Sequence, residues 1–146
     1  MKRQVRVRVH ALAGSVALLT IAVFWTSTVV SELLLGSAAV TSVKSGVLHG
    51  MFLLIPALLL ASGSGFALAA QRTGPLLAAK KRRMRVIGAN GLLILLPSAF
   101  FLHARAVSGE FDGGFYVVQA LELAAGGLNF TLLGLNLRDG LRLRLP

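Results

Sequence analysis

The sequence of 146 residues contains no cysteine, and this absence removes several classes of function at once. Without a thiol the chain cannot exchange disulfides, bind a metal through thiolates or attack a substrate with a cysteine nucleophile. A quinone-linked disulfide oxidoreductase, which is another four-helix membrane architecture, is therefore excluded. Hydrolase motifs are lacking too, because there is no nucleophile elbow, no HExxH sequence and no Walker loop. The protein is at most a redox subunit rather than an enzyme in the usual sense.

Charge is scarce, at 14% of residues, against about 25% in soluble domains. Runs without charge cover residues 9–31, 45–71 and 86–104, and residues 113–137 are interrupted only by Glu122. About 20 apolar residues cross the hydrocarbon core as a helix. Strands are excluded because lipid cannot hydrogen-bond an open backbone and these runs do not alternate in polarity. The sequence predicts an all-α polytopic membrane protein.

Four such runs predict four transmembrane helices, over about residues 9–33, 45–70, 86–105 and 113–137. The expected connections are about 36–44, 71–85 and 105–113, which leave no room for a soluble catalytic domain. Short connections favour antiparallel neighbours. We expect residues 1–146 to form a single membrane domain, a bundle of up-down-up-down topology.

The net charge of +10 is unevenly distributed. Of the 15 basic residues, 13 precede the first run, lie in the second connection or follow the last run, which leaves only Lys44 and Arg105 on the other side. The positive-inside rule then places both termini in the cytoplasm, as for a bacterial inner or plasma membrane. No aromatic residues interleave with the basic ones, so nucleic acid is not an expected partner.

Two histidines stand out in the apolar runs. His49 lies about 13 Å outward of the centre of its helix, and His103 lies about 12 Å outward on the same side. Two imidazoles at one depth are what bis-histidine ligation of haem b requires. The same pair could bind another metal, or both rings could be ordinary polar groups in the headgroup region.

A polar stripe runs along the last expected helix, over 113–137. Gln119, Glu122, Asn129 and Asn136 fall within about 100° of one face, which must turn to the bundle interior or to another subunit. A carboxylate in a bilayer costs about 2.5–3.5 kcal/mol, so Glu122 must be protonated or paired.

Three roles are open for Glu122. It could hydrogen-bond to Asn90 and to hydroxyl groups of the first helix, which would be a purely structural role. It could carry a proton. With Gln119, it could instead bind a quinone or a haem propionate, so both belong with His49 and His103 among the candidate cofactor-binding residues.

Glycines and prolines allow further expectations. Gly46 and Gly50 flank His49 and could leave room for a flat ligand, or simply let two helices approach closely. Pro56 and Pro97 lie inside expected helices, where they should produce kinks.

The four runs, both termini on one side and the pair His49 and His103 resemble the membrane-bound b-type cytochromes of the cytochrome b561 group. This resemblance implies haem b and electron transfer with quinol or a partner. Two-haem members need four such histidines, and this chain supplies one pair. The segments "VLHGMFLLIPALLLASGSGF" and "VVQALELAAGGLNFTLLGLNLRDGL" also resemble uncharacterised small bacterial integral membrane proteins, and that likeness implies no function.

Three functions remain open from the sequence. The first is a membrane protein that binds one haem b through His49 and His103 near the outer face. The second is an accessory or assembly subunit without cofactor that docks on a larger membrane complex through the polar stripe. The third is a small proton-coupled or metal transporter, which with four spans would form a homo-oligomer.

Overall fold

The computed structural model describes residues 2–70 and 72–143. This part of the chain folds into four long helical segments, each long and apolar enough to cross a membrane. They are α1 (Arg3–Leu34), α2 (Ser37–Ala69), a third segment and α5 (Gly113–Arg142). The third consists of α3 (Pro75–Asn90), a five-residue π-helical turn (Gly91–Leu95) and α4 (Leu96–Val107). The prediction of an all-α chain with four membrane-length helices is confirmed.

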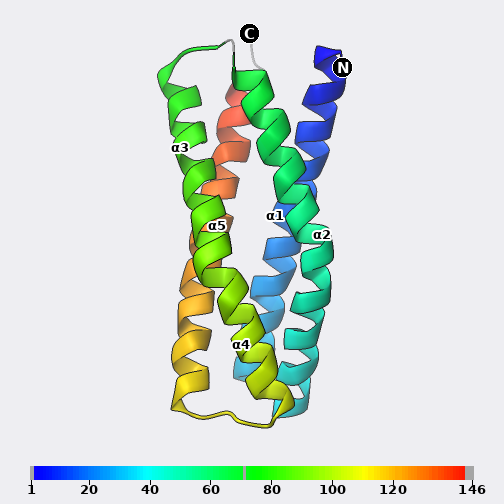
Figure 1. Cartoon of the computed structure of the whole chain (residues 1–146), viewed down its shortest axis with the longest axis vertical. Helices are drawn as coiled ribbons and strands as arrows, with labels where there is room; N and C mark the ends of the chain where they lie inside the picture. The colour runs from blue at the N-terminus through cyan, green and yellow to red at the C-terminus, as the bar shows by residue number, and fades with distance from the viewer. Residues whose placement is uncertain (1, 71, 144–146) are drawn as a thin grey trace.

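The four segments run alternately up and down in one bundle (Figure 1). The start of α1, the end of α5 and the α2–α3 connection lie together, and we call this the terminal end. The α1–α2 and α4–α5 connections lie at the opposite end, which we call the loop end. The described chain therefore has the up-down-up-down order that short connections predict.

The helices are longer than the charge-free runs, and this changes two expected connections. Residues 36–44 were expected to link the first two helices, but only Leu35 and Gly36 do so, because α2 already begins at Ser37. Most of 71–85 is helix as well. There α3 begins at Pro75, whose fixed φ suits the first helical position, after Gly74 at a φ of 143°.

The α4–α5 connection is closed by local hydrogen bonds. Gly109 has a φ of 72°, and its N–H donates to the carbonyl of Ala106 at 3.1 Å, which ends α4. Asp112 caps α5 by accepting the N–H of Phe115 at 2.9 Å. That hydrogen bond, assisted by the charge of Arg105, lowers the pKa of the exposed Asp112 carboxyl.

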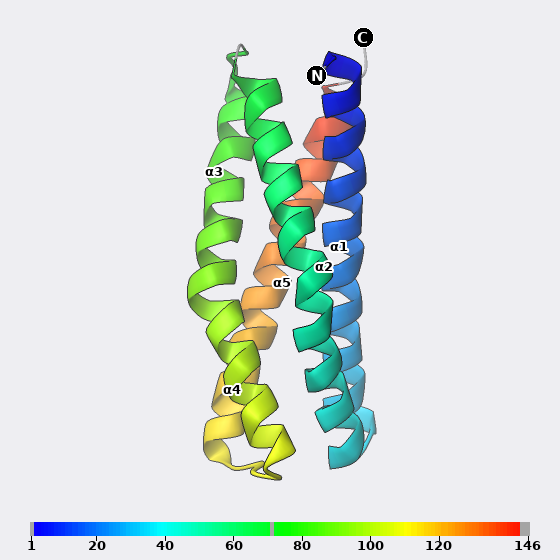
Figure 2. The same ribbon diagram turned by 45° about the vertical axis from the view of Figure 1, so that its right-hand side comes forward.

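The expected kink at Pro97 coincides with the π-helical turn. The N–H of Leu96 donates to the carbonyl of Gly91, five residues back, so the turn is wider than in an α-helix. Pro97 follows directly and has no N–H to continue the regular pattern. The ribbon bends where α3 passes into α4 (Figure 2).

The helices are not packed evenly. α1 contacts α2 extensively, whereas α2 packs against α4 and barely touches α3. One apolar cluster lies near the loop end, and we call it the loop-end plug. Its buried members are Val40, Leu102, Ala106 and Phe115.

A second apolar cluster, the central plug, has Ile21, Ile87 and Leu133 as its buried members, with Leu18, Leu54 and Met84 packed around them. Outside these clusters, large apolar side chains face outward along every helix, such as Phe52 at 84% exposure. Such a surface suits contact with lipid.

Candidate functional site

The polar stripe of α5 faces the inside of the bundle. Gln119, Asn129 and Asn136 are buried, and Glu122 is only 12% exposed. Each of these four side chains bonds to a described residue of the same chain, so the stripe is occupied within the bundle. Of the two expected directions, the bundle interior and another subunit, the stripe faces the bundle interior.

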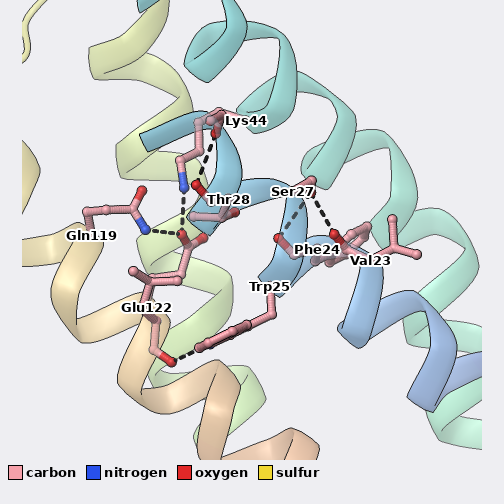
Figure 3. A network of polar contacts seen from close by, with 10 residues as sticks. Val23, Phe24, Trp25, Ser27, Thr28, Lys44, Gln119 and Glu122 are labelled. Atoms are coloured by element: carbon pink, nitrogen blue, oxygen red, sulfur yellow. Dashed lines mark hydrogen bonds and ion pairs between the residues drawn. The ribbon is translucent and has the colours of Figure 1, made fainter. Parts of the chain in front are cut away.

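An ion pair lies at the loop-end half of this stripe (Figure 3). Lys44 Nζ of α2 donates to Glu122 Oε2 of α5 at 2.7 Å, and the lysine side chain is 1% exposed. Gln119 Nε2 donates to the same carboxylate oxygen at 3.0 Å. A carboxylate in a bilayer was expected to be either protonated or paired. Glu122 is paired, with Lys44.

Two oxygen atoms beside the pair have no hydrogen-bond partner among the described residues. They are Oε1 of Gln119, whose side chain is 4% exposed, and Oε1 of Glu32 on α1. Glu32 interacts electrostatically with both Lys44 and Glu122. The site thus holds two carboxyl groups, one ammonium group and an unsatisfied amide oxygen, contributed by three helices.

The local sequence explains how Lys44 reaches the interior. Lys44 lies in the second turn of α2, one turn after Val40 and close to one turn before Val47, and both valines are buried. Residues three and four apart share a helix face. The lysine is therefore carried inward by an otherwise apolar face.

Asn90 does not bond to Glu122, so that expected contact is wrong. Asn90 Nδ2 instead donates to Asn129 Oδ1 and to the carbonyl of Ala125, both at 2.8 Å. Asn129 in turn donates to the carbonyl of Ile87 at 3.3 Å. Asn129 lies seven residues beyond Glu122, about 10 Å along α5, so Asn90 cannot serve both.

A third polar layer lies nearer the terminal end. Arg83 Nη1 of α3 donates to Asp139 Oδ2 of α5 at 2.6 Å and to Asn136 Oδ1 at 3.4 Å. From Gln119 to Asp139 the polar side chains of α5 extend over about 30 Å, which matches the thickness of the hydrocarbon core. α5 therefore carries polar groups through the whole depth of the bundle.

Two cavities lie along this line. A small one of about 70 Å³ adjoins Glu122, Trp25, Thr28, Ile21 and Leu54. A large one of about 880 Å³ opens at the terminal end and reaches down to Leu18, Met84 and Leu133. Because residues of the central plug line both cavities, this plug is the layer between them. The loop-end plug covers the ion pair from the other side, since Val40 and Phe115 are one turn from Lys44 and Gln119.

The two candidate haem ligands have little structural support. His49 is exposed, and its Nδ1 bonds to the carbonyl of Ser45 in its own helix at 2.7 Å. His103 is half-buried, and neither histidine lines one of the two cavities. No group of three or more metal-ligating His, Asp or Glu side chains occurs in the described ranges. An exposed imidazole outside both cavities is a poor fit for an axial haem ligand. Haem binding therefore stays a prediction.

The space that Gly50 provides has another occupant. A Cβ atom at this position would overlap the ring of Phe24 on α1, whereas a Cβ at Gly46 would meet nothing within 4 Å. Of the two expected uses of this glycine, close helix packing is therefore the one found. Phe24 fills the place where a flat ligand was considered.

Known protein families, curated proteins and solved structures contain no match to this chain. The resemblance to cytochrome b561 therefore stays a prediction, and the site must be interpreted from its own residues.

Sequence reasoning missed several residues of the site. Lys44 was assigned to a connection, and Glu32 lies just beyond the first charge-free run. Trp25 Nε1 of α1 donates to the carbonyl of Leu123 on α5 at 3.0 Å (Figure 3). His10 of α1 lies against α2, with Nδ1 at 2.9 Å from the carbonyl oxygen of Ala61.

Proposed function

We propose that the chain is a multi-pass protein of a bacterial inner or plasma membrane, with its terminal end in the cytoplasm, and that it carries protons across the bilayer. The outward-facing apolar side chains support insertion in lipid. The bias of basic residues toward the terminal end supports the orientation. The proton is carried by the carboxyl groups that surround Lys44.

The charge balance at Lys44 is the observation that carries this proposal. Glu32 and Glu122 share one ammonium group. Two carboxylates and one ammonium would leave one net negative charge in a region of low dielectric, which is costly. One bound proton makes the cluster neutral.

In the proposed cycle Lys44 remains charged and changes partner. With Glu122 ionised and bonded to Lys44, the proton resides on Glu32. When a proton reaches Glu122 from the cytoplasmic side, the bond to Lys44 weakens and the ammonium group turns toward Glu32. Glu32 then releases its proton toward the loop end. To close the cycle, the proton on Glu122 passes to Glu32 and Lys44 returns to Glu122, so each cycle takes up one proton and releases one.

The two cavities provide the route on the cytoplasmic side. The large cavity reaches the central plug, and the small one lies between this plug and Glu122. A volume of about 70 Å³ has room for one or two water molecules, each of which needs about 30 Å³. Glu32 lies two residues before the end of α1, close to the opposite side.

The other two functions receive less support. The accessory-subunit hypothesis needs the polar stripe as a docking face, but the side chains of this stripe bond within the chain. The haem hypothesis lacks a cavity at His49 and His103 among the two described above. The site lies within one chain, so proton transfer does not depend on a homo-oligomer.

Proton flux into liposomes tests the proposal. The purified protein is reconstituted in liposomes that contain a pH-sensitive dye, and a potassium gradient with valinomycin drives protons inward. We expect the dye to report acidification well above that of protein-free liposomes. Glu122→Gln should reduce the flux to the protein-free rate, because an amide cannot bind and release a proton at neutral pH.

Two further variants make the result specific. Glu32→Gln should also stop the flux. Glu110→Gln, which changes an exposed carboxylate in the α4–α5 connection, should leave it unchanged. Circular dichroism and gel filtration show whether each variant is folded. A wild-type flux equal to that of empty liposomes, or a folded Glu122→Gln variant with normal flux, would overturn the proposal.

A further inference from the structure

The large cavity at the terminal end has a strongly one-sided charge. Its volume of about 880 Å³ lies between α1, α2, α3 and α5. Cavities that hold small-molecule ligands measure about 300–1,000 Å³. Among the described residues, five Lys and Arg side chains line it and no acidic one does. They are Arg3, Arg8, Arg72, Lys80 and Lys81.

Among the described residues, three of these cations lack an acidic side-chain partner. The chain has five acidic side chains, Glu32, Glu110, Asp112, Glu122 and Asp139. Within the described ranges their ion pairs are with Lys44, Arg83, Arg105 and Arg138. Arg3, Arg8 and Arg72 therefore keep their charge without an acidic side chain of the described residues to balance it. The cavity attracts an anion from outside.

The rest of the lining is largely apolar. Leu18, Met84 and Leu133 form its deeper part, and Phe66 and Leu77 lie nearer the mouth. Along α1, Leu18 lies ten residues beyond Arg8, which is about 15 Å. One cavity thus combines a cationic mouth with an apolar wall deeper in the bundle, and a free inorganic anion would use only the first of these.

The cavity also has a side on which α2 and α3 both line it. Phe66 comes from α2 and Leu77 from α3, yet these two helices barely touch each other. Their weak contact gives a chain of methylene groups a way between the cavity and the surrounding lipid.

We infer that this cavity binds one anionic phospholipid, with its phosphate among Arg3, Arg8 and Arg72 and its acyl chains along the apolar wall. The inference rests on the membrane insertion proposed above but not on proton transport. Basic pockets between transmembrane helices on the cytoplasmic side suit lipid phosphates, because one guanidinium group can donate two parallel hydrogen bonds to phosphate oxygens. The anionic headgroup of the lipid would balance the positive charge at the mouth, and its acyl chains would contact the apolar wall.

Native mass spectrometry of the whole protein in nonionic detergent tests this binding. Phosphatidylglycerol and phosphatidylcholine with the same acyl chains are added, and the retained lipid is counted. We expect one phosphatidylglycerol per chain, preferred at least about tenfold. A triple variant, Arg8→Gln, Arg72→Gln and Lys81→Gln, should lose this preference, since each charge near a phosphate contributes about fivefold.

A charge-matched control separates the cavity from general surface charge. Arg6 lies in α1, Arg82 and Arg85 lie in α3, and none of the three lines the cavity. Changing these three to Gln removes the same charge and should reduce the preference by less than about twofold. An equal loss in both triple variants would mean diffuse attraction to the surface, and would overturn the site.

A second matched pair tests the apolar wall without removing any arginine. Leu77 lines the cavity, and its exposed neighbour Leu76 does not. Leu77→Glu should exclude phosphatidylglycerol, while Leu76→Glu should retain it. Loss of the lipid from both variants alike, or displacement of the lipid by millimolar inorganic phosphate, would overturn the assignment to a phospholipid. The second result would indicate a site for a small anion instead.

Discussion

The two halves of the bundle are built on different principles. Near the loop end a buried lysine meets its carboxylate beneath an apolar plug, and α2 packs closely on α4. Near the terminal end α2 and α3 barely touch, and basic side chains surround a cavity of about 880 Å³. The central charges of the loop-end half, which we call the closed half, are the enclosed pair Lys44 and Glu122. In the terminal half, which we call the open half, the Arg83–Asp139 pair is accompanied by exposed arginines without an acidic side-chain partner among the described residues.

This difference shows where each half derives its stability. In the closed half Lys44 and Glu122 depend on each other, because a buried charge that loses its partner pays the full cost of desolvation. In the open half side chains can turn into the cavity and be solvated. The same kind of substitution should therefore be costly in the closed half and tolerated in the open half, and four experiments examine this contrast.

The largest effect is expected from Glu122→Leu. It leaves the ammonium group of Lys44, which is 1% exposed, without its carboxylate. Removing one partner of a buried ion pair costs about 3–5 kcal/mol. The measurement is unfolding in mixed micelles with increasing denaturing detergent. The double variant Lys44→Met with Glu122→Leu should recover most of the loss, and a single variant as stable as the wild type would contradict the closed half as described.

The next effect is expected from Gly50→Ala. The added methyl group would overlap the ring of Phe24 between α1 and α2. Overpacking of this kind costs about 1–3 kcal/mol. Gly65→Ala in the open half should cost less, because its Cβ would lie 3.0 Å from Cε1 of His10, which lines the cavity and can shift into it.

Gly46→Ala serves as the control for both glycine variants, since nothing lies within 4 Å of its Cβ position. The same detergent unfolding curves give the three values. If Gly65→Ala proved as destabilising as Gly50→Ala, the open half would be packed as tightly as the closed half.

A smaller effect is expected from Asn129→Leu. Asn129 is 1% exposed and bonds to Asn90 and to the carbonyl of Ile87. Each interhelical hydrogen bond is worth about 0.6–2 kcal/mol in a membrane. Asn136→Leu changes the same residue type two turns further along α5, at the wall of the large cavity. Among the described residues its side chain has one hydrogen bond, a long one of 3.4 Å that it accepts from Arg83, so the loss should be smaller.

The smallest effect is expected from protonation of Asp112. The N–H of Phe115, more than the charge of Arg105, lowers the pKa of this carboxyl in the folded chain. A lowered folded-state pKa stabilises the fold above the unfolded value of 3.8, and this stabilisation disappears as the pH falls through the folded-state pKa. Unfolding of Asp112→Asn should therefore show a weaker dependence on pH below 4 than unfolding of the wild type. Identical pH dependence would mean that this cap does not contribute.

Much of the fold could be predicted because charge is so costly in lipid. Four runs almost free of charge gave four helices, and the angular spacing of Gln119, Glu122, Asn129 and Asn136 gave the inward face of α5. Both predictions depend only on the local sequence and on lipid as the surroundings of the helices. The ends of the helices were less predictable, because polar residues outside the runs continue them.

The centre of the site could not be found in this way, for a physical reason. A buried charge ends a charge-free run just as an exposed one does, so Lys44 was assigned to a connection. Its partner gave the missing signal, because an intramembrane carboxylate needs a cation, and Lys44 lies between Val40 and Val47 on one helical face. The pairing of His49 with His103 stays a prediction, since equal depth says nothing about the direction in which two side chains point.

The wide turn at Gly91–Leu95 has a consequence for the chain length of this protein. A π-helical turn in an α-helix corresponds to one inserted residue. A homologue with one residue fewer in this stretch would form an uninterrupted helix and still direct Asn90 and Leu102 inward. It would lose the wide turn ahead of Pro97, so its third helical segment should be straighter and stiffer while the other three segments keep their places.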